Sequence, residues 1–197
     1  MARDMTPVLK RCRALGIEPA YMGLDKKSKR NVRAGRKPRE YALQLKEKQK
    51  AKFIYGVLEK PFRNNFAKAQ KLKYGTTGEN LMILLELRLD NVVFRMGYAR
   101  TRKEARQIVG HKHVLVNGKC VNIPSYTVKP GDKIEIKEKV KGYQRYKDVL
   151  ETTEGRLIPD WLEADHETLT GTVKEIPTRE QIDVPVNEVL IVELYSK

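Results

Sequence analysis

The chain has few of the features that support a disulfide-bonded, secreted or membrane-spanning protein. Only two cysteines occur among its 197 residues, so a disulfide scaffold is excluded and a reducing compartment is expected. The longest apolar run, residues 81–85, is far shorter than the ~20 residues that span a bilayer. The N-terminal residues lack an apolar stretch of signal-peptide length. We therefore expect neither secretion nor contact with a membrane.

Acidic residues are scarce in the first three-quarters of the chain. Residues 1–80 carry 21 basic and 7 acidic side chains, residues 81–150 carry 15 and 7, and residues 151–197 carry 4 and 11. The net charge of +15 therefore conceals a stronger positive charge over the first 150 residues. Such an excess of one sign repels itself unless a partner neutralises it. Nucleic acid is the favoured partner, because binding to its phosphates releases counterions.

The densest basic segment, residues 26–39, holds eight basic side chains and no acidic one. It cannot bury a core, and we expect it to be extended or mobile when free. It has no apolar face, which argues against a membrane-surface helix. A solvated tail or a targeting signal is the alternative to a phosphate-binding arm.

Helical patterns dominate the first half of the chain. Apolar spacing predicts helices over 40–58 and 61–72, with Pro61 ending the first or starting the second. Thr76 and Glu79 have the spacing of a capping box. The apolar run that follows is expected to be one helix packed on both sides, or two helices separated near Asp90.

A second capping box, Thr101 with Glu104, predicts a short helix that ends at Gly110. The apolar period then changes to two, and Asn117-Gly118 predicts a β-hairpin because both turn positions need positive φ. A Pro-Gly turn at 129–132 and an alternating strand follow.

The C-terminal third is harder to interpret. Residues 159–162 suggest a packed turn or short helix, and residues 169–173 suggest a strand. Residues 184–197 fit both a helix capped by Asn187 and a strand, and we favour the helix.

Neither metal binding nor catalysis finds support. Cys12 has no cysteine or histidine nearby, and His111, His113 and Cys120 do not supply the usual four zinc ligands. No phosphate-binding glycine loop or nucleophile elbow occurs. The carboxylates of 151–167 are interpreted as a charged surface. We predict no catalytic residue, no metal and no cofactor.

The strongest constellation is residues 88–139. Arg102 and Arg106 are four apart, so we expect them on one face of a helix, with His111, His113 and Lys119 extending that face onto the hairpin. Arginine on a rigid element suits bidentate phosphate contacts. Reversing the charges of Arg102 and Arg106 should weaken RNA binding and flatten its salt dependence by roughly 0.7–0.9 per lost contact.

Residues 88–139 closely resemble the alpha-L RNA-binding module. Residues 39–69, 76–93 and 185–197 are similar to the bacterial small-subunit ribosomal protein four family. The resemblance implies an α+β protein with a basic helical arm and domain (1–85), an RNA-binding domain with a small antiparallel sheet (86–149), and an acidic extension that packs back on both (150–197). Many relatives carry an N-terminal cysteine cluster for zinc, of which only Cys12 remains here.

The same resemblance implies a function in the cytoplasmic ribosome. Family members bind small-subunit (16S) rRNA at a five-way helical junction, nucleate assembly of the subunit body, and contribute to decoding accuracy with ribosomal protein five. They contact other small-subunit proteins and lie near the mRNA entry path; no homo-oligomer is expected. An RNA-modifying enzyme and a ribosome-associated stress protein using the same module are the alternatives.

We predict that 22 residues contact rRNA, most of them basic. They are Lys26, Lys27, Lys29, Arg30, Arg33, Arg36, Lys37, Arg39, Lys46, Lys48, Lys50, Arg63, Arg95, Arg100, Thr101, Arg102, Lys103, Arg106, His111, His113, Asn117 and Lys119.

Overall fold

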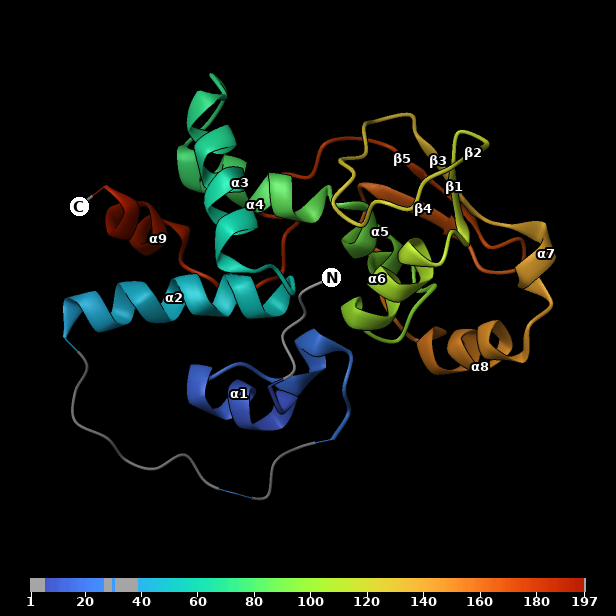
Figure 1. The fold of residues 1–197 in the computed structure, drawn as a ribbon, viewed down its shortest axis with the longest axis horizontal. Helices are drawn as coiled ribbons and strands as arrows, with labels where there is room; N and C mark the ends of the chain where they lie inside the picture. Colours follow the sequence, from blue (N-terminus) through green and yellow to red (C-terminus); the bar gives the residue numbers. More distant parts are fainter. Residues whose placement is uncertain (1–5, 27–29, 31–38, 197) are drawn as a thin grey trace. The chain divides into compact units, whose positions relative to one another are not determined.

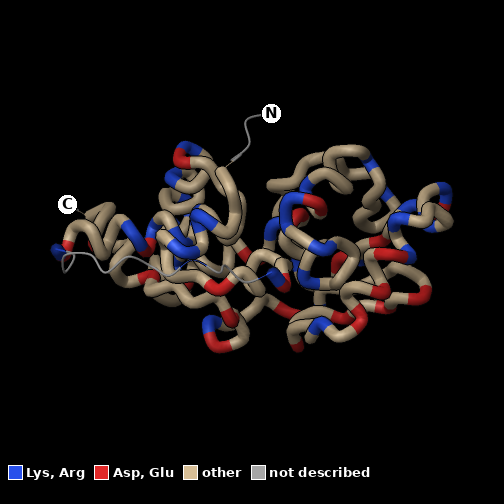
Figure 2. The backbone as a smooth tube through the Cα atoms, turned by 90° about the horizontal axis from the view of Figure 1, so that it is seen from below, with Lys and Arg blue, Asp and Glu red and all other residues tan. Residues whose placement is uncertain are grey.

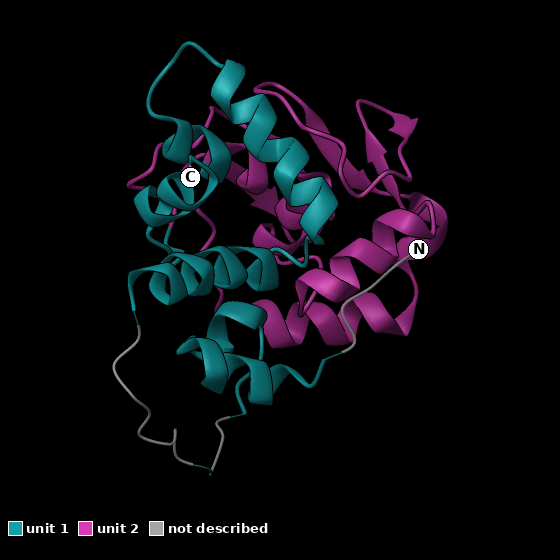
Figure 3. Ribbon diagram, turned by 60° about the vertical axis from the view of Figure 1, so that its left-hand side comes forward, with its two compact units in different colours: residues 1–82, 183–197 teal, residues 83–182 magenta. Residues whose placement is uncertain are grey.

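A computed structural model describes residues 6–26, 30 and 39–196 of the chain (Figure 1). It forms two compact units: unit 1 comprises residues 1–82 and 183–197, and unit 2 comprises residues 83–182 (Figure 3). Helices occur in both units, and a five-stranded antiparallel sheet lies in unit 2. The predicted α+β class is confirmed. None of the described helices is both long and apolar enough to cross a membrane.

Unit 1 is helical over its described residues. Its elements are α1 (Val8–Leu15), the 3-10 helix η1 (Pro19–Met22), α2 (Glu40–Ile54), α3 (Glu59–Lys71), most of α4 (Thr77–Glu86) and α9 (Glu188–Tyr195). Pro61 lies in the first turn of α3, where its missing N–H costs no helical hydrogen bond. The capping box that starts α4 is reciprocal, because the Thr76 N–H donates to Glu79 Oε2 (2.8 Å) and the Glu79 N–H donates to Thr76 Oγ1 (3.2 Å).

The C-terminal helix α9 returns to α2 within unit 1. Asn187 caps α9 by accepting a hydrogen bond from the Val189 N–H (3.1 Å), which confirms the helix over the strand. The buried Gln44 amide of α2 donates to Glu193 Oε2 (3.1 Å), and the Tyr195 ring lies 4.5 Å from the Phe66 ring of α3. The last residues of the chain therefore complete the core of the N-terminal helices.

Unit 2 packs short helices against its sheet. The helices are α5 (Leu89–Arg95), α6 (Arg102–Gly110), α7 (Glu138–Lys141) and α8 (Gln144–Thr153); the strands are β1 (Val114–Val116), β2 (Lys119–Cys120), β3 (Lys133–Ile136), β4 (Leu162–Asp165) and β5 (Thr170–Val173). The strand order is β2-β1-β3-β5-β4. Asn117 and Gly118 have φ of 51° and 74°, which confirms the predicted hairpin turn between β1 and β2.

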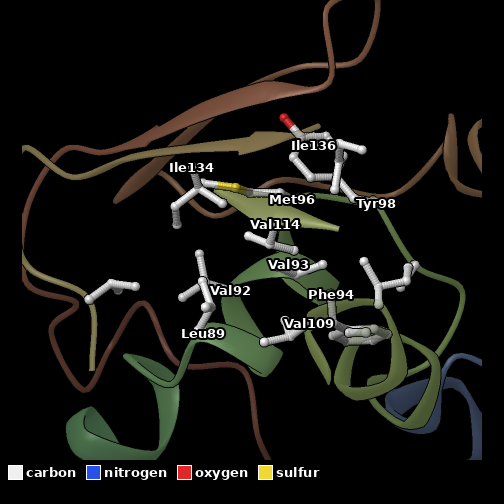
Figure 4. Packing of buried hydrophobic residues seen from close by; sticks show 14 of the residues in the cluster. Leu89, Val92, Val93, Phe94, Met96, Tyr98, Val109, Val114, Ile134 and Ile136 are labelled. Atoms are coloured by element: carbon white, nitrogen blue, oxygen red, sulfur yellow. The ribbon is translucent and has the colours of Figure 1, made fainter. Parts of the chain in front are cut away.

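The core of unit 2 lies between α5, α6 and the sheet. Figure 4 shows apolar side chains of α5 and α6 gathered beneath those of β1 and β3, including Val93, Val109 and Ile134. Trp161, which comes from the acidic part of the chain, is 1% exposed and belongs to the same cluster. Residues beyond 150 therefore contribute to the core of unit 2.

Several elements differ from the sequence predictions. The packed turn predicted at 159–162 is confirmed, because the Leu162 N–H donates to the Pro159 carbonyl oxygen (2.9 Å) and Trp161 is buried. The strand β4, which begins at Leu162, was not predicted. The strand predicted at 169–173 is confirmed by β5. The apolar run breaks into two helices, since α4 ends at Glu86 and α5 begins at Leu89. Helices α1 and α8 were not predicted, because their apolar patterns are short.

The units divide the C-terminal third between them. We expected residues 150–197 to form one extension beside domains at 1–85 and 86–149. In the structure, residues 150–182 belong to unit 2 and residues 183–197 to unit 1. The three-domain division stays a prediction.

Candidate nucleic-acid interface

Helix α6 is fixed at its start by a cap and by an ion pair. Thr101 Oγ1 accepts a hydrogen bond from the Glu104 N–H (3.2 Å), as the capping-box spacing predicts. Glu104 Oε2 accepts from the Arg100 N–H (2.8 Å), and Glu104 Oε1 pairs with Arg145 Nη2 of α8 (3.0 Å). Thr101, predicted to contact RNA, therefore acts in the described structure as a helix cap.

A buried polar network begins at Glu86, whose side chain is fully buried at the end of α4. Its carboxylate accepts from Arg95 Nη2 (2.8 Å) and from Asn91 Nδ2 (2.7 Å). The Asn91 Oδ1 in turn accepts from Arg102 Nε (2.7 Å). The Arg102 guanidinium stands 4.3 Å from the centre of the Phe94 ring. These contacts tie the start of α6 to α5.

Asp90 forms a second part of this network. Its carboxylate makes a two-bond pair with Arg88 at 2.7 and 3.0 Å, and an ion pair with Arg106 Nη1 of α6 at 3.2 Å. Asp90 and Arg88 are both buried. A buried charge with one partner removed is costly, so this network holds α5 and α6 in one arrangement.

Three of the predicted RNA-binding arginines therefore have partners inside unit 2. Arg102 is only 7% exposed, and Arg95 and Arg106 are partly buried. We expected Arg102 and Arg106 to present a common face to RNA; instead, they anchor α6 on Asn91 and Asp90. Reversing both charges would consequently damage the fold before it reports on phosphate contacts.

Other predicted residues of unit 2 lie at the surface. Three exposed residues belong to α6 or its ends: Arg100 lies just before the helix, Lys103 on it and His111 at its C-terminal end. A fourth, Lys119, is exposed on β2. The Asn117 amide joins two turns, because Nδ2 donates to Asp132 (2.8 Å) and Oδ1 accepts from the Lys133 N–H (2.9 Å). The exposed cations thus stand on elements that the internal contacts hold rigid.

His113 faces the protein rather than open solvent. Its Nδ1 lies 3.1 Å from the hydroxyl of the buried Tyr146, and its ring makes an edge contact with His111. Burial lowers the pKa of His113, and the nearby charges of His111, Arg145 and Lys137 lower it further. The ring is therefore neutral near pH 7 and positioned by Tyr146.

The lowered pKa of His113 predicts how the stability of unit 2 varies with pH. The unfolded chain protonates this ring near its ordinary pKa of about 6.5, whereas the folded chain does so only at lower pH. Stability should therefore be fully present above pH ~6.5 and fall as the pH drops below it. Chemical denaturation of wild type and His113→Asn between pH ~5 and ~7 should give a shallower slope for the variant; equal slopes would contradict this role.

The predicted RNA-binding residues of unit 1 differ in exposure and in ion pairing. Lys48 pairs with Glu59 (2.9 Å) and Lys50 with Glu47 (2.6 Å), so these lysines have partners within the unit. Lys46 is partly buried on α2, and Arg39 and Arg63 are exposed at the start of α2 and on α3. Lys26 and Arg30 are exposed. Lys27, Lys29, Arg33, Arg36 and Lys37 lie outside the described residues.

Glu59 shows how strongly α2 concentrates positive charge. Partial burial of this carboxylate favours a raised pKa, but hydrogen bonds and charge from Lys52 and Lys48 outweigh it and lower the pKa to about 2. Figure 2 shows that basic and acidic residues are interspersed on both units. The surface suited to a polyanion is therefore made of selected exposed cations and not of every basic residue.

The described residues give no metal site. No group of three or more histidine, cysteine or acidic side chains in this part of the chain is arranged to hold an ion. Cys12 is buried and Cys120 is exposed, and both are free thiols. Burial raises the pKa of the Cys12 thiol, so that side chain behaves as a small core residue.

Comparison with known proteins identifies two family domains in the chain. Residues 3–86 match the model of the ribosomal protein S4/S9 N-terminal domain, and residues 87–134 match the S4 domain. The chain is 81% identical to small ribosomal subunit protein uS4 of Lachnoclostridium phytofermentans, 72% to that of Lachnospira eligens and 69% to that of Agathobacter rectalis. Each comparison covers the whole of both chains. The chain belongs to the uS4 family of small ribosomal subunit proteins.

Proposed function

We propose that the chain is a structural component of the bacterial small ribosomal subunit that binds 16S rRNA directly and catalyses no reaction. The observation that carries this proposal is a set of exposed cations: Arg100 and Lys103 at the start of α6, which a buried ion network ties to α5, and Lys119 on the β1–β2 hairpin. Preorganised cations neutralise phosphates without being ordered at the moment of binding. Family membership places the protein in the cytoplasmic ribosome and argues against an RNA-modifying enzyme or a stress protein.

We further propose the finer role that the family resemblance implies. The protein holds several RNA helices at one junction, nucleates assembly of the subunit body, and supports decoding accuracy through contact with ribosomal protein five near the mRNA entry path. Exposed cations in both units support the first part, because each unit can contact a different RNA helix. RNA helices of A form are recognised through phosphate position and shape, which fixed cations suit.

Binding of purified full-length protein to naked 16S rRNA tests the direct contact. A filter-binding titration at several salt concentrations should give one-to-one binding whose affinity falls linearly with salt on logarithmic axes. Absence of binding at moderate ionic strength would contradict the proposal. Analysis of the RNA after incubation checks that no base is modified.

Neutralising the exposed cations of unit 2 should weaken this binding without unfolding the protein. In Lys103→Ala/Lys119→Ala, each lost phosphate contact should reduce the salt slope by roughly 0.7–0.9. Lys174→Ala, an exposed lysine on the acidic part of unit 2, is the matched control and should leave the slope unchanged. An unchanged slope in the double variant would exclude these contacts.

A further inference from the structure

Tyr74 is the most exposed aromatic side chain among the described residues. It is 84% exposed, in the loop between α3 and α4 of unit 1. Among the described residues its ring contacts no other aromatic ring, whereas the exposed Tyr143 ring leans against His113. A tyrosine ring combines a flat apolar face with a polar end, a combination that is enriched at interfaces.

The loop that carries Tyr74 is held in one conformation. Asn80, which is 6% exposed, donates from Nδ2 to the Tyr74 carbonyl oxygen (2.6 Å). Gly75 has φ of 66°, a value that side chains rarely allow. The Thr76–Glu79 capping box then fixes the start of α4 and uses the N–H groups that could otherwise meet a phosphate. The ring is therefore displayed on an ordered loop, so little backbone entropy is lost on binding.

The surroundings of Tyr74 indicate the chemistry of the partner. Residues 60–78 contain five basic side chains and no acidic one. Three of them, Lys68, Lys71 and Lys73, are exposed near the end of α3 and on the loop itself. An exposed aromatic ring flanked by cations matches the requirements of single-stranded nucleic acid, in which a base stacks on the ring and neighbouring phosphates are neutralised. A protein partner would favour a wider apolar surface than Tyr74 and the exposed Leu72 provide among these lysines.

We propose that Tyr74 is a stacking platform for one unpaired base of the small-subunit rRNA, with Lys71 and Lys73 on the flanking phosphates. This proposal rests on the proposed rRNA binding and adds a contact to it. Stacking needs only the face of a base, so the site selects an unpaired nucleotide rather than a particular base. It also differs from phosphate contacts in being insensitive to salt.

Four substitutions of Tyr74 in the full-length protein separate stacking from other contacts. Tyr74→Ala should raise the Kd for naked 16S rRNA by about 5- to 150-fold, because loss of one stacked base has an effect of this order. Tyr74→Phe and Tyr74→Trp should bind within about 2-fold of wild type, since both keep an aromatic face. Tyr74→Leu keeps apolar bulk without that face and should behave like alanine.

The salt dependence and the Trp signal provide independent readouts. Tyr74→Ala should leave the salt slope unchanged, whereas Lys71→Ala/Lys73→Ala should reduce it by about 0.7 per lost contact with single-stranded RNA. The fluorescence of Tyr74→Trp should be quenched when rRNA is added, against the constant signal of the buried Trp161. Thermal unfolding should be unaltered by each change, because residue 74 is exposed.

The outcomes distinguish this inference from the function on which it rests. Wild-type binding together with full affinity in Tyr74→Leu or Tyr74→Ala would overturn the stacking platform alone. A reduced salt slope in Tyr74→Ala would also overturn it, because the residue would then act through phosphate contacts. Failure of the wild-type protein to bind naked rRNA would overturn both.

Discussion

Replacing Arg102 by alanine should lower the free energy of unfolding by about 3 kcal/mol. The change removes the hydrogen bond that Arg102 donates to Asn91 Oδ1. Asn91 is only 2% exposed, so the loss of this donor from a buried oxygen is costly. It also removes the cation–π contact with Phe94. For a chain of this length the midpoint of thermal unfolding should fall by roughly 6–12 °C.

The neighbouring Lys103 provides the matched control for Arg102. Lys103 is exposed on the same helix, so Lys103→Ala should unfold like wild type while weakening RNA binding. Arg102→Lys keeps the charge but not the planar guanidinium, and should fall between wild type and Arg102→Ala. Wild-type stability combined with weakened RNA binding in Arg102→Ala would show that this side chain acts at the surface, as the sequence alone suggested.

Replacing Trp161 by alanine should have a still larger effect, about 3–5 kcal/mol. Trp161 is 1% exposed within the core cluster, and its carbonyl oxygen accepts a hydrogen bond from the Lys174 N–H (2.9 Å) beyond β5. Truncation leaves a cavity where the acidic part of the chain meets the α5 and α6 core. Circular dichroism during denaturation measures the loss, since the variant has no tryptophan to report by fluorescence.

Leu157→Ala is the matched control for Trp161→Ala, because it changes an exposed residue of the same segment. This residue is 92% exposed four positions before Trp161, so Leu157→Ala should be nearly neutral. Trp161→Phe keeps part of the buried volume and should lose less stability than alanine. A neutral Trp161→Ala would mean that residues beyond 150 do not support the fold of unit 2.

Local rules predicted much of the fold because short-range chemistry decides it. The Thr76 and Thr101 caps, the Asn117-Gly118 turn and the Asn187 helix start each depend on residues within a few positions. The strand at 162–165 was missed because Trp161 and Leu162 are followed by charged residues, and only pairing with β5 decides their conformation.

The candidate site was predicted less completely, because charge alone does not tell which way a side chain points. Arg102 precedes Ala105 and Val109 by three and seven positions, so it shares the buried face of α6. The acidic Glu86 and Asp90 within an apolar run were a second signal, since buried carboxylates need cationic partners. Together these signals indicate internal ion pairs where the sequence alone suggested RNA contacts.

Hydroxyl-radical footprinting of naked 16S rRNA tests whether the protein holds several RNA helices together. With one equivalent of full-length protein, we predict discrete protections in several RNA helices that meet at one junction, because fixed cations on both units hold them together. Protections should weaken as salt is raised. Either no protection at moderate ionic strength or uniform protection along duplex RNA would contradict binding at one helical junction.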